Sequence, residues 1–495
     1  LLNFSLFVVT IYYRIIIFIV ILCLSIVYTV AKKDEILNPS VIHSFPPSTQ
    51  VVALPGGDEG VYFNTSYNIK NFNTASYQKN LNRVYLYKNV LKPPLYSYYL
   101  SLFFPKNKDD LNCLYKFKKK NCVKYLNISK NVNYFTHIFH SLLLCLFIFL
   151  LTKNLYLSVG FYLLLLSSTY FLHITNYYLS EGLSAIILLI HSFCFYKFFL
   201  KYKKKYLVLL SVSLALLILT KAIFIYWFYL IIFLWILLIL LIKIRNYKYL
   251  FTSYRFNSIN LKKLIIFYLL VMFIQFPWQL RNFYETGNFS ISTQGGNVLS
   301  ERVEYMKSSY EELKFSFIWY LPRSEIKDKI VKKMGYKNFI SFDEANKSSH
   351  YRVSSENERG LVLSQLGWKD KKNPKKVFDK SLDIILQDPV KHISLSVIFL
   401  FRSLFLETYE SNLSSYQYYL TSLTHWPSTI FLIIFLFIFI VKKSKKLYLI
   451  APSIFIIIAY SNFTDFEPRY GSIYYSIFLL VISIIVNDRI KKYEK

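Results

Sequence analysis

The sequence predicts an all-α polytopic membrane protein with about ten or more transmembrane helices, a long first extracytoplasmic loop and a small extracytoplasmic domain. Three observations predict this class. Hydrophobic residues make up 54% of the 495 residues, which is more than a globular domain of this length usually carries. The mean hydropathy is +0.35. The apolar residues also form uninterrupted blocks, such as 15–31 and 228–242, which approach the length of a bilayer crossing.

The formal net charge of +31 fits this class through membrane topology. In a soluble chain such a charge would indicate a nucleic-acid partner. Here a lysine cluster such as Lys201, Lys203, Lys204 and Lys205 directly follows an apolar block, where basic residues mark the cytoplasmic side of a membrane. We therefore expect the lipid bilayer as a partner, and no nucleic acid.

The N-terminal transmembrane module is predicted to cover residues 1–276. Its first span, about 15–31, follows Arg14, so its N-terminal flank is expected inside, and its apolar run is longer than the core of a cleaved signal peptide. The polar stretch 32–134 then forms the long extracytoplasmic loop. Further spans are expected at about 135–152, 156–174, 183–200, 207–220, 223–242 and 264–276.

Basic residues decide the side on which each link lies. The link 173–182 carries no Lys or Arg, whereas the stretches 197–205 and 243–263 contain several. By the positive-inside rule the first lies outside and the other two lie inside. The spans 207–220 and 223–242 meet at a tight turn that contains Lys221.

The rest of the chain divides into a polar region and a second membrane module. Residues 277–391 have mixed charge and few long apolar runs, which predicts the small extracytoplasmic domain. The C-terminal module, 392–495, contains expected spans at about 429–441, 447–462 and 471–486. Lysines and an arginine place the C-terminal flanks of the first and last of these inside. The apolar segment 392–407, with Arg402 in its middle, is therefore predicted to be interfacial or re-entrant.

The cysteines and the histidines within the spans predict no chemistry of their own. The five cysteines form no CxxC pair or zinc-type spacing. Cys113 and Cys122 lie in the first loop, where a disulfide bridge and two free thiols both stay open. Residues His137, His140 and His191 lie in the spans, and we interpret each as a packing residue rather than a proton relay.

Four polar clusters fall at the outer ends of the predicted spans. Residues 56–60 read Gly-Gly-Asp-Glu-Gly, 92–96 read Lys-Pro-Pro-Leu-Tyr, 277–282 read Pro-Trp-Gln-Leu-Arg-Asn and 466–470 read Phe-Glu-Pro-Arg-Tyr. Each alone has a structural interpretation: an acidic turn, a membrane-entry turn, a tryptophan at the headgroup level and an exposed ion pair. Their common membrane face favours a shared site.

The order of these clusters resembles the integral-membrane glycosyltransferases of the GT-C superfamily. The likeness is to the branch of dolichyl-phosphate-mannose protein O-mannosyltransferases and lipid A aminoarabinose transferases. It covers roughly residues 15–485, and the Lys-Pro-Pro and Pro-Trp-x-x-Arg-Asn elements are its more specific parts. The resemblance implies a polyprenyl-phosphate-linked sugar as donor and chemistry on the outer membrane face.

The resemblance also implies roles for individual residues. Asp58 stands at the catalytic acid/base position with Glu59 beside it, and three cations would bind the donor phosphate, namely Lys92, Arg281 and Arg469. Other residues expected in the cavity are Glu181, which matches an acidic position in the second outer loop, Tyr96, Trp278, Asn282, Glu467 and Tyr470. Some relatives bind a metal through an acidic residue directly before Lys-Pro-Pro. Leu91 stands there in this chain, so a divalent metal stays open as a cofactor.

The chemistry of these residue types agrees with the resemblance. Glycosyl transfer from a phosphate donor needs a base for the acceptor proton and cations for the leaving phosphate. We therefore predict a multi-pass glycosyltransferase of the bacterial inner (plasma) membrane that acts on an acceptor hydroxyl at the extracytoplasmic face. The acceptor can be a protein, a lipid or a glycan. The alternatives are a lipid-linked glycan polymerase or ligase and a non-enzymatic lipid or solute transporter, although the sequence lacks the repeated halves of a transporter.

Overall fold

The computed structural model describes residues 57–76, 92–106, 120–175, 179–243, 261–306, 329, 333, 374–404, 445–464 and 468–493. Every secondary-structure element within these ranges is helical, so the all-α prediction is confirmed for this part of the chain. Four of the helices are long and apolar enough to cross a membrane: Asn127–Thr152, Glu181–Lys201, Leu261–Thr286 and Gly471–Tyr493. They support a multi-pass membrane protein. The total of about ten spans stays a prediction, because 15–31 and 429–441 lie outside the described residues.

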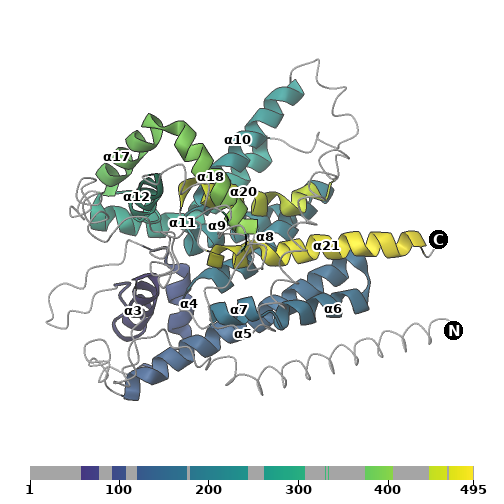
Figure 1. Cartoon of the computed structure of the whole chain (residues 1–495), viewed down its shortest axis with the longest axis horizontal. Helices are drawn as coiled ribbons and strands as arrows, with labels where there is room; N and C mark the ends of the chain where they lie inside the picture. Colours follow the sequence, from purple (N-terminus) through teal and green to yellow (C-terminus); the bar gives the residue numbers. More distant parts are fainter. Residues whose placement is uncertain are drawn as a thin grey trace.

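Two helices fold within the predicted first loop. Helix α3 (Gly57–Phe72) packs against α4 (Leu95–Phe103), and α4 packs against the long helix α5 (Lys120–Thr152), as Figure 1 shows. Aromatic residues join the three helices. The ring of Tyr125 meets those of Tyr67 and Phe104 at centroid distances of 5.3 and 5.4 Å. This part of the loop is therefore packed against the start of α5.

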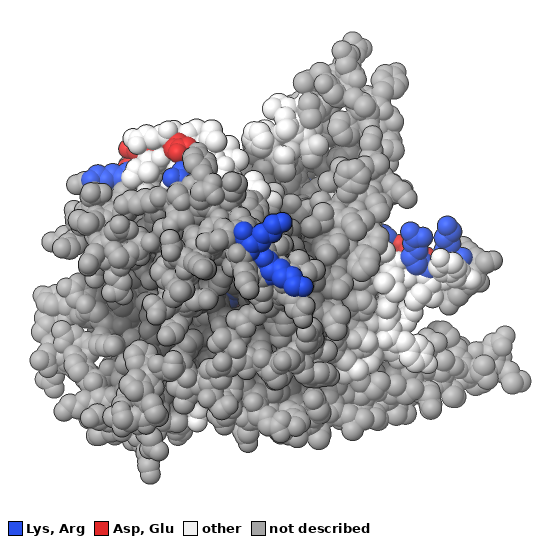
Figure 2. All heavy atoms as spheres, viewed as in Figure 1, with Lys and Arg blue, Asp and Glu red and all other residues white. Residues whose placement is uncertain are grey.

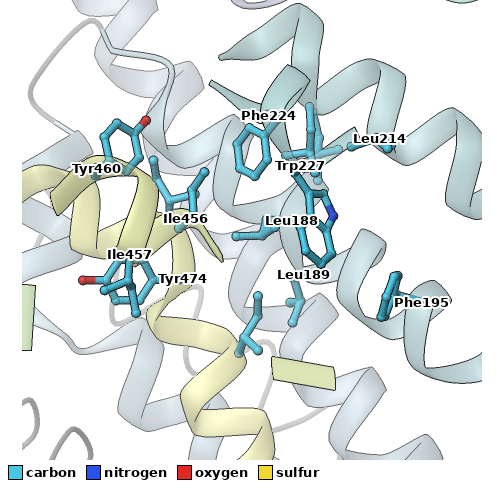
Figure 3. Close-up of a cluster of buried hydrophobic side chains, with 14 of the residues drawn as sticks. Leu188, Leu189, Phe195, Leu214, Phe224, Trp227, Ile456, Ile457, Tyr460 and Tyr474 are labelled. Carbon is cyan, nitrogen blue, oxygen red and sulfur yellow. The ribbon is translucent and has the colours of Figure 1, made fainter. Parts of the chain in front are cut away.

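The main hydrophobic core includes buried residues of α5 and of five later helices: α8 (Glu181–Lys201), α9 (Lys204–Thr220), α10 (Phe224–Lys243), α20 (Leu447–Phe463) and α21 (Gly471–Tyr493). Figure 3 shows Leu188 of α8 between Phe224 and Trp227 of α10 and Ile456 of α20. All four side chains are buried. The apolar blocks predicted as spans 183–200 and 471–486 correspond to α8 and α21.

A histidine inside this core has its polar atoms satisfied by neighbouring side chains. Trp227 donates its indole N–H to Nε2 of His191 at 2.9 Å, so the proton of the neutral imidazole belongs on Nδ1. That nitrogen lies 3.1 Å from Oγ of Ser213, which donates in turn to the Leu210 carbonyl. These contacts agree with the interpretation of His191 as a packing residue.

The predicted span 156–174 is wrong as a single helix. The structure has α6 (Leu155–Leu166) followed by α7 (Thr169–Thr175). The amide and hydroxyl of Ser167 both donate to the Leu163 carbonyl, at 2.9 and 2.7 Å, and the Ser168 amide donates to Leu165 at 3.3 Å. These bonds close the last turn of α6, because serine competes well for backbone groups at helix ends.

Helix α11 (Leu261–Thr286) continues past residue 276, where the sequence predicted the span to end. Pro277 lies inside the helix, since the loss of one amide donor is tolerated when the flanking turns are held by other contacts. The helix ends at Gly287, which has a φ of +72° and donates its amide to the Phe283 carbonyl at 2.8 Å. Glycine adopts this left-handed conformation without strain.

Three further helices also contribute buried residues to this core. α12 (Gly295–Met306) contacts α17 (Pro374–Gln387) and α18 (Pro389–Leu404), and α18 also contacts α20. Figure 1 shows α12, α17 and α18 grouped on one side of the molecule. The extracytoplasmic domain 277–391 and the interfacial placement of 392–407 stay predictions, because much of the first range lies outside the described residues.

The two ends of the bundle differ in charge. α8 ends and α9 begins among Lys201, Lys203, Lys204 and Lys205, while α21 ends with Arg489, Lys491 and Lys492. Figure 2 shows Lys and Arg side chains gathered at that end of α21. Lys446, just before α20, pairs there with Asp488 of α21. At the opposite end α8 and α21 begin, with Glu181 and Gly471 respectively.

Candidate functional site

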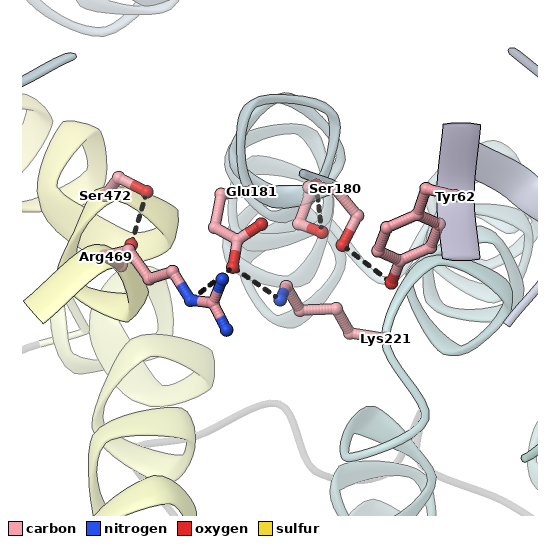
Figure 4. A network of polar contacts seen from close by, with 7 residues as sticks. Tyr62, Ser180, Glu181, Lys221, Arg469 and Ser472 are labelled. Atoms are coloured by element: carbon pink, nitrogen blue, oxygen red, sulfur yellow. Dashed lines mark hydrogen bonds and ion pairs between the residues drawn. The ribbon is translucent and has the colours of Figure 1, made fainter. Parts of the chain in front are cut away.

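A buried carboxylate lies at the end of the bundle where α8 begins. Glu181 is the first residue of α8 and is only 1% exposed. Its Oε1 accepts a hydrogen bond from Nζ of Lys221 at 3.0 Å and lies 3.6 Å from Nε of Arg469 (Figure 4). A carboxylate in the first turn of a helix also meets the positive end of the helix dipole. One carboxylate oxygen thus joins cations from two distant parts of the chain.

Local structure positions each of the two cations. Lys221 follows α9 directly, and its amide donates to the Leu217 carbonyl at 2.7 Å, which caps that helix. Arg469 lies in the short 3-10 turn η6 (Pro468–Tyr470) before α21, and its carbonyl accepts from the Ser472 hydroxyl at 2.7 Å. Both cations are therefore held at helix ends, where backbone direction changes sharply.

An aromatic pair forms one wall of this site. Tyr470 stacks on Tyr460 of α20 at a centroid distance of 4.2 Å, with the rings 13° from parallel. The Tyr470 ring lies 5.3 Å from Nζ of Lys221 and 5.5 Å from the Arg469 guanidinium. Cations near an aromatic face gain electrostatic stabilisation. We call Glu181, Lys221, Arg469 and Tyr470 the Glu181 cluster.

The charges of the Glu181 cluster do not balance. It contains one carboxylate and two cations, and the Lys221 and Arg469 side chains are only 13% and 20% exposed. Oε2 of Glu181 is buried and has no hydrogen-bond partner among the described residues. Buried polar atoms are normally hydrogen-bonded. Among the described residues, Oε2 can therefore accept a hydrogen bond from a further donor.

The predicted phosphate ligand Lys92 lies beside Tyr62, a residue that contacts Ser180 just before Glu181. Lys92 is 5% exposed, and its Nζ is 6.0 Å from the ring centroid of Tyr62 on α3. The Tyr62 hydroxyl lies 3.3 Å from Oγ of Ser180, as Figure 4 shows. Tyr96, also a predicted cavity residue, meets Tyr62 edge-on at 5.1 Å and donates its hydroxyl to Asn133 at 2.9 Å. Lys92 and Tyr96 are thus brought toward the Glu181 cluster through Tyr62.

The third sequence cluster lies in a different set of contacts. Arg281 donates to the Ala75 carbonyl at 2.9 Å and to Oδ1 of Asn282 at 2.8 Å, and its guanidinium is 4.5 Å from the Trp278 ring. Asn282 and the Trp278 indole donate to the Ile291 carbonyl at 3.1 and 3.0 Å. Trp278 and Asn282 hold the segment after α11, and Arg281 joins α11 to the segment after α3.

Three predicted acidic residues cannot be placed in the same way. Asp58 and Glu59 belong to the first turn of α3, but their side chains lie outside the described residues, as does all of Glu467. Position 58 precedes Tyr62 by one helical turn. Since Tyr62 contacts Ser180, the start of α3 is directed toward the start of α8.

Sequence reasoning missed Lys221 as a functional residue and treated it only as part of a turn. A signal was present, because a single lysine stands in a short link between two apolar spans on the side that the positive-inside rule depletes of cations. Tyr62 and Ser180 were missed for another reason. Neither has a distinctive spacing, and only the tertiary structure shows that their hydroxyl groups lie 3.3 Å apart.

The described residues do not fit a divalent metal. No group of three His, Cys, Asp or Glu side chains lies together anywhere in the described ranges. Around Glu181 the neighbouring charged groups are Lys221 and Arg469, and these repel a divalent cation.

No protein-family model, curated protein or solved structure matches this chain. The Glu181 cluster combines two cations with a buried carboxylate whose Oε2 has no hydrogen-bond partner in the described part of the chain. It lies at the end of the bundle away from the lysine-rich helix ends.

Proposed function

We propose that the chain is a membrane glycosyltransferase that moves a sugar from a polyprenyl-phosphate donor to an acceptor hydroxyl at the extracytoplasmic face. The observation that supports this most directly is the Glu181 cluster, in which Lys221 and Arg469 meet on one buried carboxylate at 3.0 and 3.6 Å. Two cations in a partly desolvated setting suit a phosphate, because each contact is worth more there than in water.

The uneven distribution of Lys and Arg between the two ends of the bundle supports an extracytoplasmic position for the Glu181 cluster. The Glu181 cluster lies where α8 and α21 begin, whereas the lysines and arginines of 201–205 and 489–492 lie where these helices end or where α9 begins. The positive-inside rule assigns the lysine-rich end to the cytoplasm. The cluster then lies on the extracytoplasmic face, which is the periplasmic face in the bacterial inner membrane that we propose.

The two cations suit the leaving phosphate of the donor. In the proposed step the acceptor oxygen forms a bond to the anomeric carbon while the bond from that carbon to the phosphate oxygen breaks. The electron pair goes to the phosphate, where Lys221 and Arg469 offset the charge and arginine offers two parallel hydrogen bonds. Asp58 takes the acceptor proton as general base, and Lys92 approaches the same phosphate from the side of Tyr62.

Glu181 has a definite part in this proposal. Before the donor binds, Oε1 neutralises part of the charge of Lys221 and Arg469, and this lowers the cost of burying both cations. When the donor binds, its phosphate replaces the Glu181 carboxylate as the partner of Lys221 and Arg469. Oε2, which is buried and lacks a partner among the described residues, then accepts a hydrogen bond from a sugar or acceptor hydroxyl.

A direct test uses the purified protein in lipid nanodiscs with radiolabelled polyprenyl-phosphate sugars and a membrane extract as acceptor. Transfer of label is expected for the wild type, with a loss of at least about tenfold in Arg469→Gln, since a charge-assisted hydrogen bond is worth about 1.5 to 3 kcal/mol. Arg489→Gln is the matched control, because Arg489 lies on α21, the helix that follows Arg469, but is exposed at the lysine-rich end of that helix.

The outcomes separate the alternatives. Equal transfer in both arginine variants would overturn the assignment of Arg469. Growth of a polymer on the lipid carrier would indicate the polymerase or ligase. Movement of intact donor across proteoliposomes without transfer of label would indicate a transporter.

A further inference from the structure

Arg302 is the largest fully buried side chain among the described residues, with an exposure of 0%. It lies on α12, in the polar region that follows α11, and no pattern in the sequence distinguishes it. A guanidinium carries five N–H donors and a permanent charge. Burying it is unfavourable unless those donors are satisfied, so its partners indicate what it holds together.

The guanidinium of Arg302 contacts two other helices. On α18, Nε donates to Nδ1 of His392 at 3.4 Å, and Nη2 donates to the His392 carbonyl at 3.0 Å and to the Ser396 hydroxyl. The ring of Phe399 lies 4.9 Å below the guanidinium. On α20, Nη1 donates to the carbonyls of Ser461 and Thr464 at 3.1 and 3.3 Å. One side chain therefore joins α12, α18 and α20.

The contacts on α20 fall at its C-terminal end. α20 ends at Phe463, and the last carbonyls of a helix lack partners within the helix and carry the negative end of its dipole. A buried cation that donates to Ser461 and Thr464 satisfies two of these carbonyls. Arg302 thus fixes the point at which the chain leaves α20.

That point leads directly to the Glu181 cluster. The link from Thr464 to Arg469 is short, and its two sides are held together by the stacked rings of Tyr460 and Tyr470, 4.2 Å apart. Arg469 then reaches Glu181 at 3.6 Å. The position of Arg469 accordingly depends on two anchors, which are the start of α21 and the end of α20.

We propose that Arg302 is a positioning residue for Arg469: by holding the C-terminal end of α20 against α12 and α18, it fixes one anchor of the link that carries Arg469 and Tyr470. The proposal rests on the proposed function only in treating the Glu181 cluster as the reactive site. It makes the α12 region a part of the site's framework, although no residue of α12 belongs to the Glu181 cluster.

Lysine cannot replace Arg302 in this role. A lysine ammonium has three donors around one nitrogen, whereas the described acceptors of Arg302 lie on two helices and need donors that point in different directions. Arg302→Lys keeps the charge, but its single nitrogen can donate to only some of the acceptors on the two helices. Arg302→Met keeps much of the volume and loses all the donors.

Hydrogen exchange of the protein in nanodiscs tests the proposal without any assay of transfer. In Arg302→Met we expect amides of 464–472 to exchange about tenfold faster than in the wild type, because at least one net hydrogen bond that holds the helix end is lost. Arg302→Lys should give a smaller increase. Amides within α8 and α9 should be unchanged in both variants.

A matched control is His191→Leu, which removes a polar node that is also 0% exposed and that joins α8, α9 and α10 instead. Exchange in 464–472 should stay near the wild-type rate in this variant. Unchanged exchange in 464–472 in both Arg302 variants, or an equal increase in all helices, would overturn the proposal.

A kinetic arm separates this proposal from the proposed function. If transfer is observed, Arg302→Lys should lower kcat more than it changes KM for the acceptor, and an unchanged kcat would contradict a role in placing Arg469. If no transfer is observed even in the wild type, the proposed function fails while the exchange data still decide whether Arg302 holds the link.

Discussion

Replacing Glu181 by Gln should lower the free energy of unfolding, because it removes the carboxylate that pairs with two largely buried cations, Lys221 and Arg469. The Coulomb attraction between Glu181 and Lys221 at 3.0 Å is about 5.5 kcal/mol at an effective dielectric constant of about 20. Desolvation of both ions offsets much of this, and removing one partner of a buried pair typically costs about 3 to 5 kcal/mol. Because Lys221 and Arg469 are 13% and 20% exposed, we expect about 3 kcal/mol.

The assay is unfolding of the purified protein in mixed micelles of increasing SDS content, arranged as a double-mutant cycle. Glu181→Gln and Lys221→Met should each destabilise the protein, and the double variant should lose about 2 kcal/mol less than the sum of the two, since the second change then removes no further pair. A matched cycle at Lys446 and Asp488, whose side chains are 24% and 53% exposed, should give a coupling below about 1 kcal/mol. Additive losses at Glu181 and Lys221 would refute the reasoning.

Four further predictions follow from the same contacts. Burial, together with the nearby Arg302 charge, lowers the pKa of His392 to about 4. In the unfolded chain this pKa is near 6.5, so the unfolded state binds more protons than the folded state between about pH 6.5 and 4. SDS unfolding should therefore show that stability is lost as the pH falls through that range, with a weaker pH dependence in His392→Gln. Arg281→Lys should destabilise by about 1 to 2 kcal/mol, because lysine loses the fork that reaches Ala75 and Asn282; equal unfolding curves would contradict this. In a variant without the native cysteines, a cysteine introduced at exposed Asn73 should react with an impermeant maleimide in intact cells. A cysteine introduced at exposed Lys203 should react only after permeabilisation; the reverse pattern would invert the topology. Asp58→Asn should lower transfer by about 100-fold or more without changing the unfolding curve, and near-normal turnover would remove Asp58 from the mechanism.

The sequence predicts the long apolar helices well, because a continuous apolar block near bilayer length has few other stable arrangements. α8 and α21 therefore lie close to their expected limits. Helices α3 and α4 were not predicted, since their residues mix polar and aromatic side chains without a long apolar run. The division between α6 and α7 depends on two serines that take backbone carbonyls, a choice that hydropathy does not detect.

Part of the candidate site could also be predicted. Glu181, Lys92 and Arg469 were selected from sequence. In the structure Arg469 lies 3.6 Å from Glu181, and Lys92 lies beside Tyr62, which contacts Ser180. Lys221 and Arg302 were not selected. Their roles come from tertiary packing, because a lone cation in a turn or on a polar helix becomes informative only when its buried partners are known.

The order in which the chain is synthesised has a consequence for the Glu181 cluster. Glu181 and Lys221 are 40 residues apart and can pair once α8 and α9 have entered the membrane. Arg469 follows Lys221 by 248 residues, so the second cation arrives only after all the intervening helices have been made. Until then this site of the nascent chain pairs Glu181 with Lys221 and lacks Arg469. A ribosome that stops before η6 and α21 therefore leaves a membrane-inserted product whose cluster lacks its second cation.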